Sequence, residues 1–140
     1  MATMKLQVIS PDAVVYEGDI TMLVVRATSG TLGILPHHLP MIAGILPCAM
    51  RAKLEDESEE LIAVAGGFME VQRDKITVLA SCAETPIMID RHRAEQAYAR
   101  AKERIDRFHH GFEPPKDIDI KRAELALERA IARLKVSNSK

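Results

Sequence analysis

The hydrophobic pattern of the chain changes its period near Pro86, and this change limits the possible folds more than any other feature. Before it, apolar and polar residues alternate, as in Lys5-Leu6-Gln7-Val8 and Lys75-Ile76-Thr77-Val78-Leu79, and a period of two is typical of strands. After it, apolar residues recur at helical spacing. We therefore expect an α+β chain in which the strands come first and the helices follow.

Turn residues divide residues 4–82 into short segments. Examples are Ser10-Pro11-Asp12, Glu17-Gly18-Asp19 and Arg73-Asp74, and such clusters separate strands. Their spacing is close to the 8–12 residues that sandwiches and barrels show, so we predict an all-β sandwich of roughly eight to ten strands. The Gly66-Gly67 pair lies between two apolar runs and is expected to form a tight hairpin or a bulge.

Two amphipathic helices are predicted in the rest of the chain. Asp90 and Asp119 are the expected N-caps, and His109-His110-Gly111-Phe112-Glu113-Pro114-Pro115 is a strong stop between the helices. A linker this short predicts an antiparallel helical hairpin. The expected apolar stripes are Ala94, Ala97, Ala101, Ile105 and Phe108 on the first helix, and Ile120, Ala123, Leu127, Ala130 and Leu134 on the second.

Alanine dominates both stripes, which makes the hairpin weak. Small side chains bury little apolar area, at roughly 25 cal/mol per Å², and a unit of about 50 residues is marginal even with a good core. The hairpin is therefore expected to need support from the sandwich or from another protein. We divide the chain into a sandwich at 1–87 and a movable helical hairpin at 88–140.

Charge is distributed unequally between these two parts. Residues 1–87 carry 6 Lys and Arg against 11 Asp and Glu, whereas residues 88–140 carry 13 against 9. This asymmetry indicates different neighbours for the two parts. The basic part is suited to an acidic protein, a nucleotide or a nucleic acid. The alternative is that these charges only keep exposed helix faces in solution.

The sequence contains no recognisable catalytic or metal-binding motif. There is no GxSxG, HExxH, P-loop or Rossmann fingerprint, and Cys48 and Cys82 have no metal-ligand spacing. We expect no catalytic residue and no metal site. No apolar run approaches the ~20 residues of a membrane span, and the N-terminus lacks the apolar stretch of a signal peptide, so a cytosolic chain with reduced thiols is expected.

Arginines align on one face of each predicted helix. Arg100–Arg104 and Arg129–Arg133 are like-charge pairs four residues apart, and such pairs are mildly destabilising in an isolated helix. Aligned guanidinium groups favour an anionic partner, which is either a carboxylate-rich protein loop or a phosphate group. An ordinary exposed charged face is the alternative interpretation.

A series of short motifs, in order along almost the whole chain, resembles the epsilon subunit of the bacterial F-type ATP synthase. Any one of them is weak, but the ordered set is specific. The motifs are Val8-Ile9-Ser10-Pro11-Asp12, Val15-Tyr16-Glu17-Gly18, Gly33-Ile34-Leu35-Pro36 with His38 and Pro40, Ala65-Gly66-Gly67-Phe68-Met69-Glu70-Val71, Ile89-Asp90 with Arg93-Ala94, and Asp117-Ile118-Asp119 with Lys121-Arg122-Ala123.

The resemblance implies a non-catalytic subunit of the rotor. Its ten-stranded sandwich would bind the gamma subunit and the ring of c subunits, as a peripheral part of F1 on the cytoplasmic side of the cell membrane. It would couple proton or sodium transport to ATP synthesis. The hairpin would fold against the sandwich or extend toward the alpha and beta subunits, where it would inhibit ATP hydrolysis. No cofactor and no nucleic acid is implied.

The resemblance also implies a regulatory ATP site that does not need Mg²⁺. Several members of the family bind ATP at the folded hairpin through an isoleucine-aspartate pair followed, after two residues, by arginine-alanine. The matching positions here are Ile89, Asp90, Arg93 and Ala94, and the further ligand positions fall on Glu84, Arg100, Arg129 and Arg133.

Three features depart from the family pattern. Thr31 replaces an acidic residue, and His37 replaces a glycine, in the loop expected to face the c ring. The linker 109–118 is longer than in compact members, which bears on how the hairpin closes. Two other functions stay open at this point: a free-standing nucleotide sensor, and a nucleic-acid module. The latter is disfavoured because the chain is not basic overall.

Overall fold

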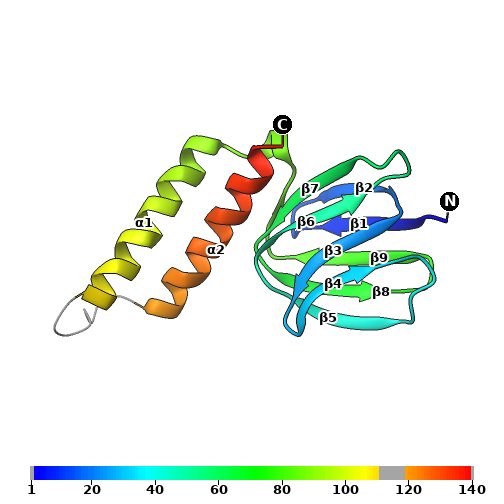
Figure 1. Cartoon of the computed structure of the whole chain (residues 1–140), viewed down its shortest axis with the longest axis horizontal. Coiled ribbons are helices and arrows are strands. Elements are labelled where there is room, and N and C mark those ends of the chain that lie inside the picture. The colour runs from blue at the N-terminus through cyan, green and yellow to red at the C-terminus, as the bar shows by residue number, and fades with distance from the viewer. Residues whose placement is uncertain (1, 111–118, 140) are drawn as a thin grey trace.

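The computed structural model describes residues 2–110 and 119–139 and shows a β-sandwich beside two antiparallel helices (Figure 1). The strands are β1 (Met4–Ile9), β2 (Val14–Ile20), β3 (Met22–Ala27), β4 (Gly30–Ile34), β5 (Met41–Ile45), β6 (Cys48–Lys53), β7 (Glu59–Val64), β8 (Gly67–Val71), β9 (Lys75–Ala80) and β10 (Ala83–Glu84). A short 3-10 helix, η1 (Pro86–Met88), leads into α1 (Arg91–His110) and α2 (Ile120–Ser137). The predicted fold class is confirmed.

All ten strands belong to one connected set of ladders. Their order is β10-β7-β6-β3-β5-β8-β9-β1-β2, with β4 paired to β3. Every pair is antiparallel except β1 and β9, which are parallel. The first strand therefore lies between its hairpin partner and a strand some 70 residues later in the chain, a connection that local sequence does not reveal.

The sandwich core is aliphatic and follows the predicted alternation. Leu6 and Val8 on β1 face it, and so do Ile76 and Val78 on β9; all four are fully buried. Their polar neighbours on each strand point outward, because successive side chains of a strand lie on opposite faces. The larger buried residues also include Met4, Ile20, Leu23, Ile34, Met50, Ile62 and Met69.

Of the two structures predicted at Gly66-Gly67, a tight hairpin or a bulge, the hairpin is wrong. β7 pairs with β6 and β10, whereas β8 pairs with β5 and β9, so the two flanking strands are not neighbours. Both glycines have positive φ, 113° and 150°, a conformation that glycine adopts at low cost. The glycines were correctly interpreted as a turn, but this turn connects two strands that do not pair with each other.

Both predicted helix caps are confirmed. The backbone N–H of Arg93 donates to Asp90 Oδ1 at 3.2 Å, and that of Arg122 donates to Asp119 Oδ1 at 3.2 Å. His109 and His110, expected in the loop, are instead the last residues of α1. The remainder of the predicted stop, most of the linker 109–118 and the pair Asp117-Ile118 lie outside the described residues.

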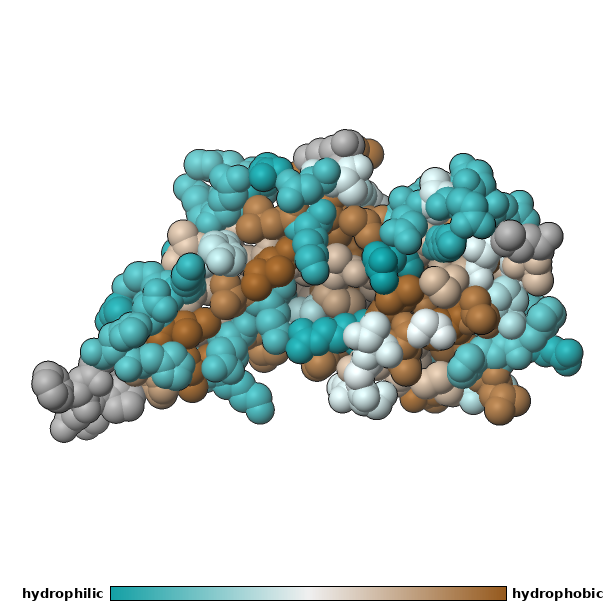
Figure 2. All heavy atoms as spheres, viewed as in Figure 1, coloured by the Kyte–Doolittle hydropathy of each residue, from teal (hydrophilic) through white to brown (hydrophobic). Residues whose placement is uncertain are grey.

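The helix α2 lies between α1 and the sandwich (Figure 1). One face carries the predicted alanine seam, in which Ala123 and Ala130 are buried opposite Ala94 and Ala101 of α1. Its other face contacts the sandwich through Ala132 and Val136, which form a small buried cluster with Ala63 and Ile89. Figure 2 shows hydrophobic residues between the helices and the sandwich, and hydrophilic residues along the outer surface of α1.

Candidate functional site

A cleft at the base of the hairpin brings together most of the residues predicted to bind ATP. We call it the hairpin-base cleft; its volume is about 320 Å³, within the roughly 300–1,000 Å³ of small-molecule sites. It is lined by Cys82, Glu84, Met88, Ile89, Asp90, Arg93, Ala94, Ala97, Arg100 and Arg133. Seven of the eight predicted residues are in this set.

Three separate segments build the hairpin-base cleft. Cys82 and Glu84 come from the end of the sandwich, the lining residues from Met88 to Arg100 come from η1 and the start of α1, and Arg133 comes from the last turns of α2. Antiparallel packing places the start of one helix beside the end of the other. The side chain of Arg91 accordingly hydrogen-bonds to Asn138, the C-cap of α2.

An ion pair between Arg133 and Glu84 joins α2 to the sandwich inside the cleft. The Arg133 Nε donates to Glu84 Oε1 at 2.7 Å, and the two side chains are 32% and 22% exposed. Burial alone would lower the pKa of Arg133, but the hydrogen bond and charge of Glu84 together raise that pKa above its ordinary value. Arg133 therefore keeps its positive charge, and its hydrogen bond to Glu84 sets the orientation of its guanidinium group.

The N-terminal turn of α1 supplies the opposite wall. Ile89 and Ala94 are buried, at 3% and 2% exposure, and they hold the turn in place. Asp90 Oδ1 caps the helix by accepting the backbone N–H of Arg93. The exposed side chains of Arg93 and Arg100 line the cleft. A helix N-terminus with two arginines beside it is suited to phosphate oxygens.

Arg129 is the one predicted residue that does not line the hairpin-base cleft. It lines a small adjoining cavity together with Glu84 and Arg133, and also a larger cleft farther along the hairpin. The sequence-based prediction also missed Cys82, Met88 and Ala97, which do line the hairpin-base cleft. The sequence could have indicated Ala97, because it belongs to the predicted apolar stripe of the first helix. No sequence pattern indicated Cys82 or Met88.

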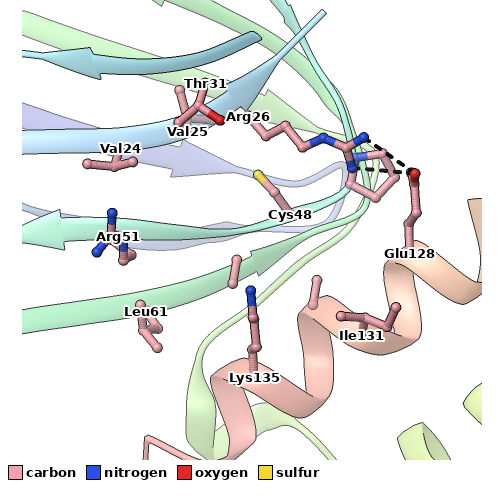
Figure 3. Close-up of a pocket in the computed structure, with 13 residues that line it drawn as sticks. Val24, Val25, Arg26, Thr31, Cys48, Arg51, Leu61, Glu128, Ile131 and Lys135 are labelled. Atoms are coloured by element: carbon pink, nitrogen blue, oxygen red, sulfur yellow. Dashed lines mark hydrogen bonds and ion pairs between the residues drawn. The ribbon is translucent and has the colours of Figure 1, made fainter.

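A second opening, the sheet groove, lies where α2 meets the sandwich (Figure 3). At its rim Arg26 on β3 points toward Glu128 on α2, with Nη1 and Oε1 3.4 Å apart. Inside it, burial raises the pKa of the Cys48 thiol. The groove therefore marks a second polar attachment of α2 to the sandwich, on a different strand from Glu84.

The two substituted positions of the family pattern, Thr31 and His37, lie in different elements. Thr31, expected in a loop, is instead in β4 and lines the sheet groove beside Arg26. His37 lies in a turn with φ of 66°, the left-handed conformation that glycine adopts most easily. The positive φ explains why glycine is the usual residue at this position of the pattern.

Large apolar side chains are exposed on the outer surface of the sandwich. Gly44 on β5 lies opposite Phe68 on β8, and Phe68 lies opposite Leu79 on β9. Phe68 and Leu79 are 63% and 54% exposed, and Ile42, two residues before Gly44 on the same face, is 77% exposed. We call Ile42, Phe68 and Leu79 the apolar strip. Ile42 itself lies opposite the exposed Glu70, diagonally from Phe68. Large apolar side chains exposed near one another mark interaction surfaces.

Within residues 2–110 and 119–139, no three His, Cys, Asp or Glu side chains are grouped as a metal site would require. Over the same residues, neither helix has the length and apolar character needed to cross a bilayer.

Family models match both parts of the chain. The model described as the ATP synthase delta/epsilon chain beta-sandwich domain matches residues 3–86, and the long alpha-helix domain of the same chain matches residues 88–138. Two relatives are ATP synthase epsilon chains. The one from Bacillus licheniformis is 49% identical over 137 residues, which cover 98% of this chain and 99% of the relative. The one from Bacillus cytotoxicus is 46% identical over the whole of both chains.

A solved structure with the same fold is a chain of the Euglena gracilis mitochondrial ATP synthase OSCP/F1/c-ring assembly. Its TM-score is 0.77 at 18% identity, covering 99% of this chain and 82% of that one. The family models and the full-length relatives at 44% identity and above are the basis of the assignment. The chain belongs to the delta/epsilon chain family of the F-type ATP synthase, as an epsilon subunit of that complex rather than as an enzyme in its own right.

Proposed function

We propose that the chain is a rotor subunit of the central stalk, on the cytoplasmic side of the cell membrane. In this role the sandwich binds the gamma subunit and the c ring and couples proton or sodium transport to ATP synthesis. The apolar strip supports a protein partner, because Phe68 and Leu79 are exposed opposite each other and Ile42 is exposed on the adjacent strand, diagonally from Phe68. We assign the apolar strip to gamma.

We further propose that ATP binds in the hairpin-base cleft and regulates hydrolysis by the complex. The observation that supports this most directly is the convergence of Arg93, Arg100 and Arg133 on one cleft. Guanidinium forks match phosphate oxygens, and the N-terminus of α1 adds a favourable dipole. Glu84 and Asp90 contribute carboxylate oxygens that accept hydrogen bonds. The arginines neutralise the phosphates without Mg²⁺.

ATP would select the compact hairpin, because the cleft exists only where α1, α2 and the end of the sandwich meet. Separation of the helices from the sandwich removes Glu84 from Arg133 and opens the cleft. A ligand shifts a conformational equilibrium by its differential affinity for the two states. At low ATP the hairpin would extend toward the alpha and beta subunits and inhibit hydrolysis, and at high ATP it would stay folded.

The test is calorimetric titration of the full chain with ATP, without Mg²⁺, for the wild type and for Arg93→Ala. Removing one charge-assisted phosphate contact is expected to weaken binding by about tenfold or more. Lys102→Ala is the matched control, since Lys102 is exposed on the same helix and does not line the cleft; its affinity should equal that of the wild type.

Two results would contradict the site. One is the absence of heat at millimolar ATP, and the other is equal affinity of Arg93→Ala and the wild type. Binding that is weakened equally by Arg93→Ala and Lys102→Ala would indicate a general charge effect in place of a defined site. Assembly with gamma is a separate measurement, so failure of the nucleotide site leaves the rotor assignment to be judged independently.

A further inference from the structure

A second cleft between the two helices is lined mainly by arginines; we call it the arginine cleft. Its volume is about 610 Å³. The lining residues are Arg104, Arg107, Asp119, Arg122, Ala123, Ala126 and Arg129. Two of the four arginines come from the second half of α1 and two come from α2, so the positive charge belongs to both helices at once.

The positive charge of this cleft is only partly neutralised by the residues that the structure describes, since Arg107 Nη1 lies 3.6 Å from Glu103 Oε1. Among residues 2–110 and 119–139, no ion pair joins Arg104, Arg122 or Arg129 to an acidic side chain. The carboxylate of Asp119 accepts the backbone N–H of Arg122 as the cap of α2. Like charges gathered across a weak alanine seam oppose closure of the hairpin, and an anion between them would offset that repulsion.

The chemistry of the lining indicates the class of anion. Several guanidinium groups facing one cleft match an anion with several charges and many oxygens, which is a phosphate chain. Among the described residues of the lining, Ala123 and Ala126 are the apolar ones, and they offer no large flat surface on which a nucleotide base would stack. The N-terminus of α2, at Asp119, adds a favourable dipole.

We propose that the arginine cleft is a second anion site, which binds inorganic pyrophosphate or a short polyphosphate and bridges α1 to α2. This site is distinct from the hairpin-base cleft, which is lined by Arg93 and Arg133 and lies at the other end of the hairpin. Arg129 lies between the two clefts, because it lines the arginine cleft and also the small cavity beside Glu84. Occupancy of the arginine cleft stabilises the closed hairpin whether or not ATP is bound.

The experiment is calorimetric titration of the full chain with pyrophosphate. The variant Arg104→Gln/Arg122→Gln removes one arginine from each helix and keeps good helix formers. Its matched control is Lys102→Gln/Lys121→Gln, which removes the same charge from exposed positions of the same two helices outside both clefts. The arginine double variant is expected to weaken pyrophosphate binding by about tenfold or more, and the lysine double variant by less than about threefold.

Two further arms separate this site from its neighbour. In an Arg93→Ala background, which removes a phosphate contact of the hairpin-base cleft, Arg104→Gln/Arg122→Gln should still weaken pyrophosphate binding by about tenfold or more. Pyrophosphate should also slow amide hydrogen exchange in both α1 and α2 of the wild type. Failure of Arg104→Gln/Arg122→Gln to weaken binding further in that background would place the anion in the hairpin-base cleft and overturn the proposal. Equal weakening in the arginine and lysine double variants would overturn it too, as would binding without any change in hydrogen exchange. Circular dichroism of each variant checks that the helices are formed.

Discussion

Single residues at the turns of the sandwich decide how closely its strands approach. Gly67 begins β8 and lies opposite Ala80 of β9. A methyl group at Gly67 would be 2.1 Å from the carbonyl oxygen of Leu79. This is far shorter than any non-bonded contact between a carbon and an oxygen atom. The φ of 150° is also strained for any residue with a side chain. Gly67 is therefore required by both space and backbone conformation.

Gly67→Ala is expected to destabilise the chain by about 3 kcal/mol or more, because the new methyl group forces β8 and β9 apart. Gly33→Ala is the control: its nearest neighbour would be Met22 Sδ at 4.0 Å, so it should cost less than about 1 kcal/mol. Urea unfolding monitored by circular dichroism measures both. Equal urea midpoints for the two variants would contradict the prediction and show that the pairing of β8 with β9 adjusts around the new methyl group.

At the scale of elements, α2 is the only helix with substantial contact to the sandwich among the described residues, through β6 and β7. The apolar part of that contact is small, and its most buried members are Ala132 and Val136. Two ion pairs add to it, Arg26–Glu128 and Arg133–Glu84. The first is largely exposed and contributes little. The helical hairpin is therefore held by few interactions, as a movable element requires.

Val136→Asp is expected to release the hairpin from the sandwich, because it removes a fully buried side chain and places a charge in its position. Lost burial alone costs about 1.5–3 kcal/mol, and the buried carboxylate adds to this. Lys121→Asp is the control, since Lys121 is exposed on the same helix and lines neither the sheet groove nor the two clefts. Hydrogen exchange of α1 and α2 measures release. Protection of the helices in Val136→Asp equal to that in the control would contradict this account.

At the scale of the whole molecule, the main core is formed by residues of the sandwich alone. Its buried members lie between Met4 and Ala83, and none comes from α1 or α2. Over the part of the chain that the structure describes, the cluster shared with the hairpin has four buried residues. We therefore propose that the sandwich folds without the helices, and that the chain divides near Met88.

Truncation after Met88 is expected to leave a sandwich that unfolds cooperatively and still joins the complex, because the main core and the apolar strip are intact. The assembled complex should hydrolyse ATP faster at low ATP, since the hairpin that we propose to be inhibitory is gone. Thermal unfolding, co-purification with gamma and steady-state ATPase assays measure the three effects. A non-cooperative melt, or hydrolysis unchanged under inhibiting conditions, would contradict the division or the inhibitory role respectively.

Local sequence was sufficient to predict most of the secondary structure. The period-two pattern around Leu6 and Ile76 predicted strands with one buried face, and Asp90 and Asp119 were correctly identified as caps. These features depend on interactions between residues close in the chain, so the sequence reports them directly. The partners of β7 and β8 were predicted wrongly, because strand pairing is decided by contacts between distant segments.

The candidate site shows the same division. The resemblance of the sequence to its family identified Glu84, Asp90, Arg93 and Arg133, but only the fold shows that they line one cleft while Arg129 lies beside it. The sequence by itself determined the element types, the helix caps and the alanine seam. The tertiary structure alone decided strand order, the second buried face of α2 and the convergence of arginines, because each depends on packing free energy between segments that are far apart in the chain.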